Sequence, residues 1–148
     1  MMVVIMLKKD SNQNDKTIKS SNRKCLFCGV SNHSKAVKII AQYNHCYVME
    51  DNYPVSKGHL LIISKDHVEN WFAASFKVKT NMIKALDEMK ASLDKRYQPG
   101  GYNIGMNCGI VAGQSINHLH IHLIPRYQND VEDPRGGVRG VIPSKQKY

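Results

Sequence analysis

The stretch "NHLHIHLIPR", from Asn117 to Arg126, decides the fold of this chain and points to its chemistry. Histidines occupy every second position, and leucine or isoleucine fills the positions between and after them. Successive side chains of a β-strand point to opposite faces, so the alternation predicts a strand with one apolar face and one histidine face. The apolar face suits a core. On the other face, His118, His120 and His122 are expected about 6.5–7 Å apart along the backbone, toward a cleft, a metal ion or solvent.

Three readings of this histidine face are open: accident, a metal site and catalysis. Strict alternation of three histidines beside a core-forming face is a poor match to accident. Three ligands in a row on one flat strand converge poorly on a single ion, although histidine is the commonest such ligand. The remaining reading is an imidazole nucleophile acting on an electrophile such as phosphorus. The nearby "VAGQS" (111–115) and Asn107 favour it, because they offer amide and hydroxyl donors and a glycine that lets a ligand approach the backbone.

Outward from this strand, the pattern predicts a single α+β domain. Short apolar segments rich in β-branched residues predict strands at 36–42, 45–51, 59–64, 102–109 and 118–125. Between them a helix is predicted over about 68–97, ended by "QPGG" at 98–101. Short links between consecutive strands favour an antiparallel sheet. The apolar residues that carry the helical spacing are Phe76, Ile83, Leu86, Met89 and Leu93.

Composition limits the class of protein. The chain has 148 residues, 42% of them hydrophobic, which suits one compact domain. Lys and Arg number 21 against 12 Asp and Glu, a net charge of +9 that favours an anionic partner, either nucleic acid or a phosphorylated small molecule, but also suits plain solubility.

No apolar stretch reaches the roughly 18–20 residues of a membrane span, and no signal peptide is evident, so we expect a cytoplasmic protein. Residues 8–24 are almost wholly polar, and we expect residues 1–24 to form a flexible arm and residues 25–148 the domain.

The cysteines suggest a metal rather than disulfides, because a reducing compartment is expected. Cys25 and Cys28 have the C-x-x-C spacing with which two thiolates grip one zinc ion. Cys46 and Cys108 lack such spacing, and we expect them to be buried thiols.

Several segments together resemble the histidine triad (HIT) family of nucleotide hydrolases and transferases. "HLHIHL" fits the family's histidine pattern, and "CLFC" (25–28), 51–70 and 105–118 agree with it. The segment "DPRGGVRGVIP" (133–143) resembles one bacterial branch, although Gly140 stands where a large aromatic residue is expected. The resemblance spans about residues 25–145. It implies a HIT-like fold with about five antiparallel strands and one long helix, and a homodimer whose two sheets join.

The resemblance also implies a reaction. A purine nucleotide conjugate, either a dinucleoside polyphosphate or a nucleoside phosphoramidate, would be hydrolysed at its α-phosphate through a nucleotidyl-histidine intermediate. His120 would be the nucleophile, His122 would support the phosphate, and His59 would orient the cluster. An imidazole with the ordinary pKa of about 6.5 is largely unprotonated at neutral pH, so it can serve as a nucleophile.

Positions matching the family's binding residues are implied for each part of the nucleotide. Asp51 would bind the ribose hydroxyls. Leu26, Phe27, Met49 and Asn52 would surround the base, although the three apolar residues suit an ordinary core equally well. The implied phosphate contacts are Asn107, Gln114 and Ser115.

For the metal, the resemblance implies a closed Cys₂His₂ set that holds a structural zinc ion. Its ligands would be Cys25, Cys28, His67 and His118. His33 and His45 are competing ligands because they are close in sequence, and a metal-free site is also open.

Alternative functions remain at this point. One is nucleotidyl transfer or phosphorolysis, in which another acceptor replaces water, although the third histidine argues against the hexose uridylyltransferase branch. Another is a non-catalytic module that binds nucleotides or, through the basic arm, nucleic acid. Nucleic acid is the less favoured partner, and no membrane association is expected.

Overall fold

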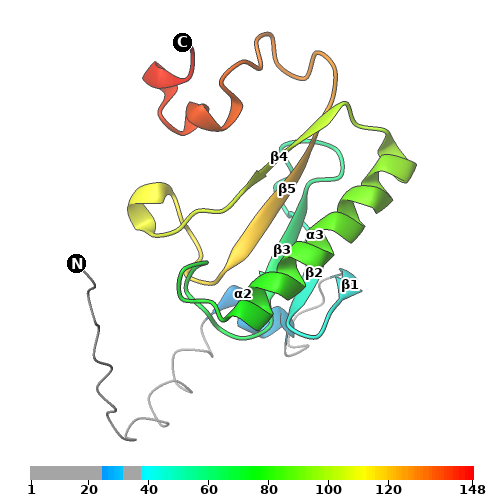
Figure 1. Ribbon diagram of the computed structural model, residues 1–148, viewed down its shortest axis with the longest axis vertical. Helices are drawn as coiled ribbons and strands as arrows, with labels where there is room; N and C mark the ends of the chain where they lie inside the picture. The colour runs from blue at the N-terminus through cyan, green and yellow to red at the C-terminus, as the bar shows by residue number, and fades with distance from the viewer. Residues whose placement is uncertain (1–24, 32–37) are drawn as a thin grey trace, which may run out of the picture.

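The chain folds into a five-stranded antiparallel sheet with strand order β1-β2-β3-β5-β4 (Figure 1). The structure is a computed structural model and describes residues 25–31 and 38–148, so the predicted arm at 1–24 lies outside it. The α+β prediction, with about five antiparallel strands and one long helix, is confirmed. The strands are β1 (Ile39–Gln42), β2 (Cys46–Glu50), β3 (Leu60–Ser64), β4 (Gly101–Gly105) and β5 (His120–Arg126).

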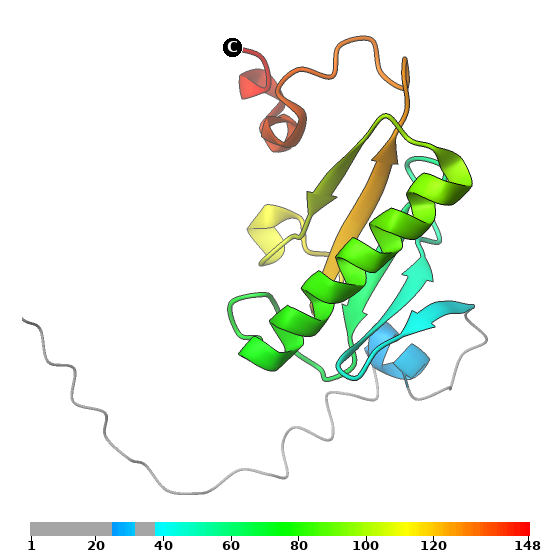
Figure 2. The ribbon, with the colours of Figure 1, turned by 45° about the vertical axis from the view of Figure 1, so that its right-hand side comes forward.

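A long helix, α3 (Phe76–Tyr97), covers one face of the sheet (Figure 2). The apolar side chains that alternate with the histidines, Leu119, Ile121 and Leu123, are buried in the core beneath it. The helix contributes the buried residues Val78, Met82, Ala85 and Leu93. The apolar face predicted for the histidine strand is therefore confirmed. Among the described residues, no helix combines the length and the apolar character that crossing a membrane requires.

The helix begins later than predicted, at Phe76 instead of about residue 68. The Asn70 side chain accepts hydrogen bonds from the backbone N–H groups of Phe72 (3.0 Å) and Ala73 (3.2 Å), which holds the chain in a turn. Ser75 then caps the helix by accepting a bond from the Val78 N–H.

The apolar stripe of the helix was only partly predicted. Leu93 is buried, and Leu86 and Met89 pack against the core. Phe76 and Ile83 are exposed, because the core-facing positions near them are Val78 and Met82. The helix ends as predicted, with Gln98 in the left-handed conformation before Pro99.

A short helix that was not predicted, α2 (Leu26–Ser31), lies against the opposite face of the sheet. Phe27 and Val30 of this helix pack with Tyr47, Met49, Leu61 and Ile63. β3 is therefore covered on both faces, by α3 and by α2, which explains why "LLIIS" is apolar at consecutive positions.

β4 ends at Gly105, earlier than the predicted residue 109. Past it, the Asn107 side chain donates to the Gly113 carbonyl (3.2 Å), and the Gly109 N–H donates to the side chain of Gln114 (2.7 Å). These bonds close a loop that carries the 3₁₀ turn η1 (Ile110–Ala112). The C-terminal segment, with η2 (Gly137–Val141) and η3 (Pro143–Lys145), lies on the β4 side of the molecule (Figure 2).

Candidate functional site

The site is built on one row of residues that crosses the sheet. Met49 of β2 pairs with Leu61 of β3, Leu61 pairs with His122 of β5, and His122 pairs with Gly105 of β4. Directly paired residues of antiparallel strands point to the same face. His122 therefore has an apolar side chain on one side and an open glycine on the other.

A hydrogen bond determines which ring nitrogen of His120 carries the proton. Its Nδ1 lies 2.8 Å from the backbone carbonyl oxygen of His118. A carbonyl can only accept, so Nδ1 carries the proton, and in the neutral ring the lone pair is on Nε2. His120 is buried, and the Phe27 ring packs edge-on against it with 5.3 Å between centroids. The ring is thus held with an unprotonated nitrogen available.

A second chain of hydrogen bonds fixes the proton of His122. The backbone N–H of Val55 donates to Nδ1 of His59 (3.3 Å), so the proton of the neutral His59 ring is on Nε2. That Nε2 lies 3.0 Å from Nδ1 of His122 and donates to it. In neutral His122 the proton is consequently on Nε2, where it remains available to a ligand.

Burial keeps both rings neutral. Burial, followed by the neighbouring His120 and His59, lowers the pKa of His122 to about 4, while Asp51 opposes this shift. Burial also lowers the pKa of His59, and Asp51 again opposes it. The Asp51 oxygen lies 3.6 Å from His59 and 3.7 Å from His122, and with neutral rings these contacts are not ion pairs.

The three groups Asp51, His59 and His122 lie close enough to meet one metal ion. We assign them to hydrogen bonding instead, because metal binding through Nε2 of His59 would place a proton on Nδ1, opposite the Val55 N–H. The other oxygen of Asp51 accepts from the Tyr53 N–H (2.9 Å), which fixes the carboxylate.

A separate cluster brings together Cys25, Cys28, His67 and His118. Nδ1 of His118 lies 3.3 Å from the sulfur of Cys25 and 3.5 Å from that of Cys28, and Nδ1 of His67 lies 3.3 Å from Cys28. Sulfur and nitrogen ligands of a tetrahedral zinc ion are about 3.5 Å apart. His118 donates from Nε2 to the Ser64 carbonyl (2.8 Å), which leaves Nδ1 unprotonated and directed at the thiols.

The electrostatics of this cluster also suit a cation. Burial and the neighbouring Cys25 thiol raise the pKa of Cys28 to about 11, so a thiolate there requires positive charge nearby. Burial lowers the pKa of His118 to about 4, so the ring is neutral, as a metal ligand must be. The residues present therefore fit zinc.

The competing ligands do not join this cluster within the described residues. His45 is not part of it, and His33 lies outside the residues that the structure describes. Cys46 is buried as predicted, and burial raises the pKa of its thiol to about 11. Cys108 is only half-buried, so the prediction of a buried thiol is wrong there, because β4 ends before it and the loop is open to solvent.

An apolar cavity of about 100 Å³ lies on the β2 and β3 side of the histidine row. It contains the four residues predicted around a base, Leu26, Phe27, Met49 and Asn52, together with Asp51 at its edge. Phe27 and Met49 also belong to the core, so the same side chains pack in the core and line the cavity.

The three residues predicted to contact phosphate differ in their surroundings. Ser115 is exposed, and Asn107 is half-buried. Gln114 is buried, with its oxygen accepting from the Gly109 N–H and its nitrogen donating to the Glu69 carbonyl (2.6 Å). Gln114 therefore fixes the loop beside the histidines.

Sequence reasoning missed several residues of the site. Leu61 shares the face of His59 two positions earlier, and the period-two rule applied from His59 would have found it. Val55 acts through its backbone N–H, and Val30 and Ile116 reach the cavity from segments with no distinguishing pattern.

Comparison with known proteins agrees with this geometry. The HIT domain pattern matches residues 32–129. An uncharacterized HIT-like protein of Methanocaldococcus jannaschii is 37% identical over 108 residues, which cover 73% of this chain and 83% of that protein. The adenosine 5′-monophosphoramidase hnt1 of Schizosaccharomyces pombe is 26% identical over 102 residues, 69% of this chain and 74% of its own.

Solved structures show the same fold. A crystal structure of a HIT family protein from Bacillus anthracis superimposes with a TM-score of 0.70 at 29% identity, covering 72% of this chain and 76% of that one. The match of the domain pattern and the identity to the archaeal relative lead to one conclusion: this chain belongs to the HIT family.

Proposed function

We propose that this protein hydrolyses purine nucleotide conjugates at the α-phosphate, with His120 as the nucleophile. The observation that carries the proposal is the 2.8 Å bond from Nδ1 of His120 to the His118 carbonyl. It leaves the Nε2 lone pair for attack on phosphorus, and attack by a neutral imidazole needs no metal activation. The relative named as a phosphoramidase supports the same class of reaction.

Each step can be written with its bonds and protons. Nε2 of His120 forms a bond to phosphorus, and the bond from phosphorus to the leaving atom breaks. The leaving atom takes the electron pair and one proton from solvent, and the Nε2–H of His122 is placed to donate a hydrogen bond to the phosphate as charge develops. Water then attacks phosphorus, the bond from phosphorus to Nε2 of His120 breaks, and the nitrogen recovers its lone pair. The oxygen of the water becomes part of the released mononucleotide, and one proton returns to solvent.

The nucleoside would occupy the cavity on the β2 and β3 side. Its apolar walls suit a purine ring held by stacking and contact area, with loose selection among purines. The Asp51 oxygen that does not accept from the Tyr53 N–H would accept from the ribose hydroxyls. The exposed Ser115 and the half-buried Asn107 would donate to the phosphate.

We further propose a structural zinc ion held by Cys25, Cys28, His67 and His118. When bound, it would supply positive charge to the thiolates and cross-link α2 to the start of β5. One of these four residues, His118, also supplies the backbone carbonyl that orients His120. The proposed zinc site would therefore support the geometry of the nucleophile.

A homodimer joined along β4 completes the proposal. Among the described strands, β4 pairs only with β5, so its outer edge presents unpaired backbone groups. Ile104 on this strand and Ile110 beyond it are exposed apolar residues near that edge. Sedimentation should give twice the chain mass.

The proposed reaction is tested by incubating the zinc-loaded protein with adenosine 5′-phosphoramidate and with diadenosine tetraphosphate. Rapid alkaline quenching followed by mass analysis should find one nucleotidyl group on the peptide that contains His120. His45→Asn is the matched control, because His45 belongs to neither histidine cluster. Absence of turnover of both substrates above the His120→Asn background would falsify the hydrolase assignment.

The alternative functions give different results in the same experiment. In heavy-oxygen water, hydrolysis places the label in the released mononucleotide, whereas phosphorolysis releases an unlabelled nucleoside diphosphate. A non-catalytic nucleotide-binding module would bind the substrates with equal affinity in the wild type and in His120→Asn, with no release of product from either.

A further inference from the structure

A tight turn at residues 56–59 connects the loop after β2 to the start of β3. The backbone N–H of His59 donates to the Ser56 carbonyl (3.2 Å), which closes the turn. Gly58 within it has a φ of +85°, a left-handed conformation that glycine adopts without strain. Val55 leads directly into this turn, and its backbone N–H donates to Nδ1 of His59 (3.3 Å). The position of the turn therefore decides whether His59 receives that hydrogen bond.

Tyr97, at the end of α3, supports this turn from the face of the sheet that the helix covers. A Cβ atom added at Gly58 would lie 3.0 Å from the Tyr97 ring and 3.1 Å from the Leu93 side chain. The glycine thus lets the turn lie directly against the ring. Lys57 adds a second contact, because its Nζ lies 5.0 Å from the centre of the same ring. The ring of Tyr97 consequently meets two successive residues of the turn.

Tyr127, one residue past the end of β5, holds the same turn by a hydrogen bond. Its hydroxyl donates to the backbone carbonyl of Lys57 (2.8 Å). Burial, followed by the neighbouring Tyr97, raises the pKa of Tyr127, so the hydroxyl stays protonated. Because a carbonyl can only accept, the bond depends on this hydroxyl as its donor.

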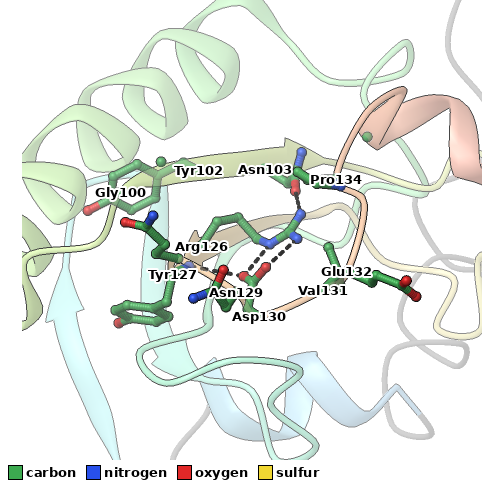
Figure 3. Close-up of a pocket in the computed structure, with 13 residues that line it drawn as sticks. Gly100, Tyr102, Asn103, Arg126, Tyr127, Asn129, Asp130, Val131, Glu132 and Pro134 are labelled. Carbon is green, nitrogen blue, oxygen red and sulfur yellow. Dashed lines mark hydrogen bonds and ion pairs between the residues drawn. The ribbon is translucent and has the colours of Figure 1, made fainter.

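The backbone of Tyr127 is itself held by Asp130. The Asp130 carboxylate accepts from the Tyr127 N–H (3.0 Å), and from Nε (2.6 Å) and a terminal nitrogen (2.7 Å) of Arg126 (Figure 3). The other terminal nitrogen of Arg126 donates to the side chain of Asn103 in β4 (2.6 Å). These charge-assisted bonds fix the backbone from which the Tyr127 side chain reaches Lys57.

The Val55 N–H connects the turn to the histidine that faces the phosphate. It can donate only to an unprotonated nitrogen, so its bond to Nδ1 places the proton of neutral His59 on Nε2. That Nε2 donates to Nδ1 of His122 (3.0 Å), which leaves the proton of His122 on its own Nε2. Displacement of the turn would remove the Val55 donor, and both rings could then take either tautomer.

We propose that Tyr97 and Tyr127 are positioning residues of the reaction. Through the turn at 56–59, they determine which ring nitrogen of His59 and of His122 carries the proton. This role rests on the proposed function, in which the Nε2–H of His122 donates to the phosphate. Both tyrosines lie outside the apolar cavity and the two histidine clusters, so they act through the turn and not on the substrate.

The test measures the tautomers directly, by long-range ¹⁵N–¹H NMR of the histidine rings in the full-length protein without substrate. In the wild type, we expect an unprotonated Nδ1 and a protonated Nε2 in both His59 and His122. Tyr127→Phe removes only the hydroxyl that holds Lys57. The two ¹⁵N shifts within each ring should then move toward each other, as in a mixture of tautomers, and the Val55 amide should exchange faster with solvent.

Tyr43→Phe is the matched control, because the Tyr43 hydroxyl also donates a 2.8 Å bond, to Glu88, and Tyr43 belongs to neither histidine cluster. It should leave the tautomers unchanged. Tyr97→Leu removes the ring beneath Gly58 and should change them, whereas Tyr97→Phe keeps the ring and should not. Wild-type tautomers in either Tyr127→Phe or Tyr97→Leu, or an equal change in Tyr43→Phe, would overturn the proposal.

Turnover of adenosine 5′-phosphoramidate gives a second, separate readout. In Tyr127→Phe, kcat should fall about tenfold with little change in KM, because the substrate contacts remain and only the donor to the phosphate is misplaced. Wild-type protein that shows the expected tautomers but turns over no conjugate would contradict the proposed function alone. Altered tautomers in Tyr127→Phe with undiminished kcat would contradict the positioning role alone.

Discussion

Two groups of side chains on the histidine face differ in which ring nitrogen carries the proton. We call the cluster that contains His118 the metal end, and the group that contains His120 the reaction end. At the metal end, His118 donates from Nε2 to the Ser64 carbonyl and offers Nδ1 to the thiols. At the reaction end, His120 donates from Nδ1 to the His118 carbonyl and offers Nε2. The side chains are chemically identical and two residues apart. The difference teaches that backbone carbonyls, rather than the histidines themselves, determine which ring nitrogen each histidine offers, and so separate the proposed ligand from the proposed nucleophile.

The two ends are also connected, because His118 belongs to both. Its ring closes the metal set, and its carbonyl holds the ring of His120. Phe27 gives a second connection, since it lies between the two cysteines in sequence and packs edge-on against both His118 and His120. The following experiments separate the two ends or test how strongly they are joined.

The largest expected effect is at the reaction end. His120→Asn removes the Nε2 lone pair, and we expect kcat/KM to fall by about 10³-fold or more. Metal content by atomic spectroscopy and the melting temperature should be unchanged, because the four metal ligands remain. A variant that lost its metal as well would show that the two ends cannot be separated.

Next in size is the loss of the donor that fixes His122. His59→Phe removes the hydrogen bond to Nδ1 of His122, so the ring can take the other tautomer, and we expect kcat to fall about 10²-fold. His59→Gln keeps a side-chain N–H and should recover part of the activity. Higher activity in His59→Phe than in His59→Gln would mean that the ring, rather than its proton, matters.

At the metal end, Cys28→Ser should abolish stoichiometric zinc binding. A metal present at several hundred times its dissociation constant contributes about 3 kcal/mol to the free energy of unfolding, so calorimetry should show a clearly lower melting temperature. Activity should fall less than in His120→Asn, through displacement of the His118 carbonyl. Cys46→Ser is the control, because Cys46 is buried away from the cluster.

The smallest expected effect is on acid stability. His122 in the folded protein has a pKa of about 4, whereas an unfolded histidine titrates near 6.5. Between these values the unfolded chain binds the extra proton, so the contribution of His122 to stability is complete above pH 6.5 and is lost as the pH falls toward 4. NMR titration of the His122 ring should show this low midpoint. Asp51→Asn should lower it further, since the carboxylate raises this pKa.

Much of the fold follows from local sequence patterns. Alternation in "HLHIHL" and the apolar segments around it predict the strands, because a period of two residues matches the two faces of a sheet. The start of α3 could not be predicted from its apolar spacing, since Asn70 and Ser75 stop the helix pattern through side-chain bonds to the backbone. The helical form of α2 is hidden because its six residues are too few to show a period.

Some features of the candidate site could likewise be predicted from the sequence, and others could not. The Cys25–Cys28 pair follows from its spacing, and the other two members of the Cys₂His₂ set and the residues around the apolar cavity follow from the family resemblance. The structure brings each of the two groups together. The tautomers could not follow from sequence, because they depend on the carbonyls of Ser64 and His118 and on the N–H of Val55. The position of the C-terminal segment beside β4 could not be predicted either, because it is a tertiary contact without a local pattern.

The row from Met49 through Leu61 and His122 to Gly105 has a consequence for inhibitor design. Neighbouring strands are about 4.8 Å apart, so the three steps of this row span roughly 14 Å. On the proposed function, a compound with a purine at the Met49 end and a non-hydrolysable phosphorus over the histidines would leave one strand spacing to fill toward Gly105. Its selectivity could be changed at the Gly105 end alone, leaving the purine end as it is.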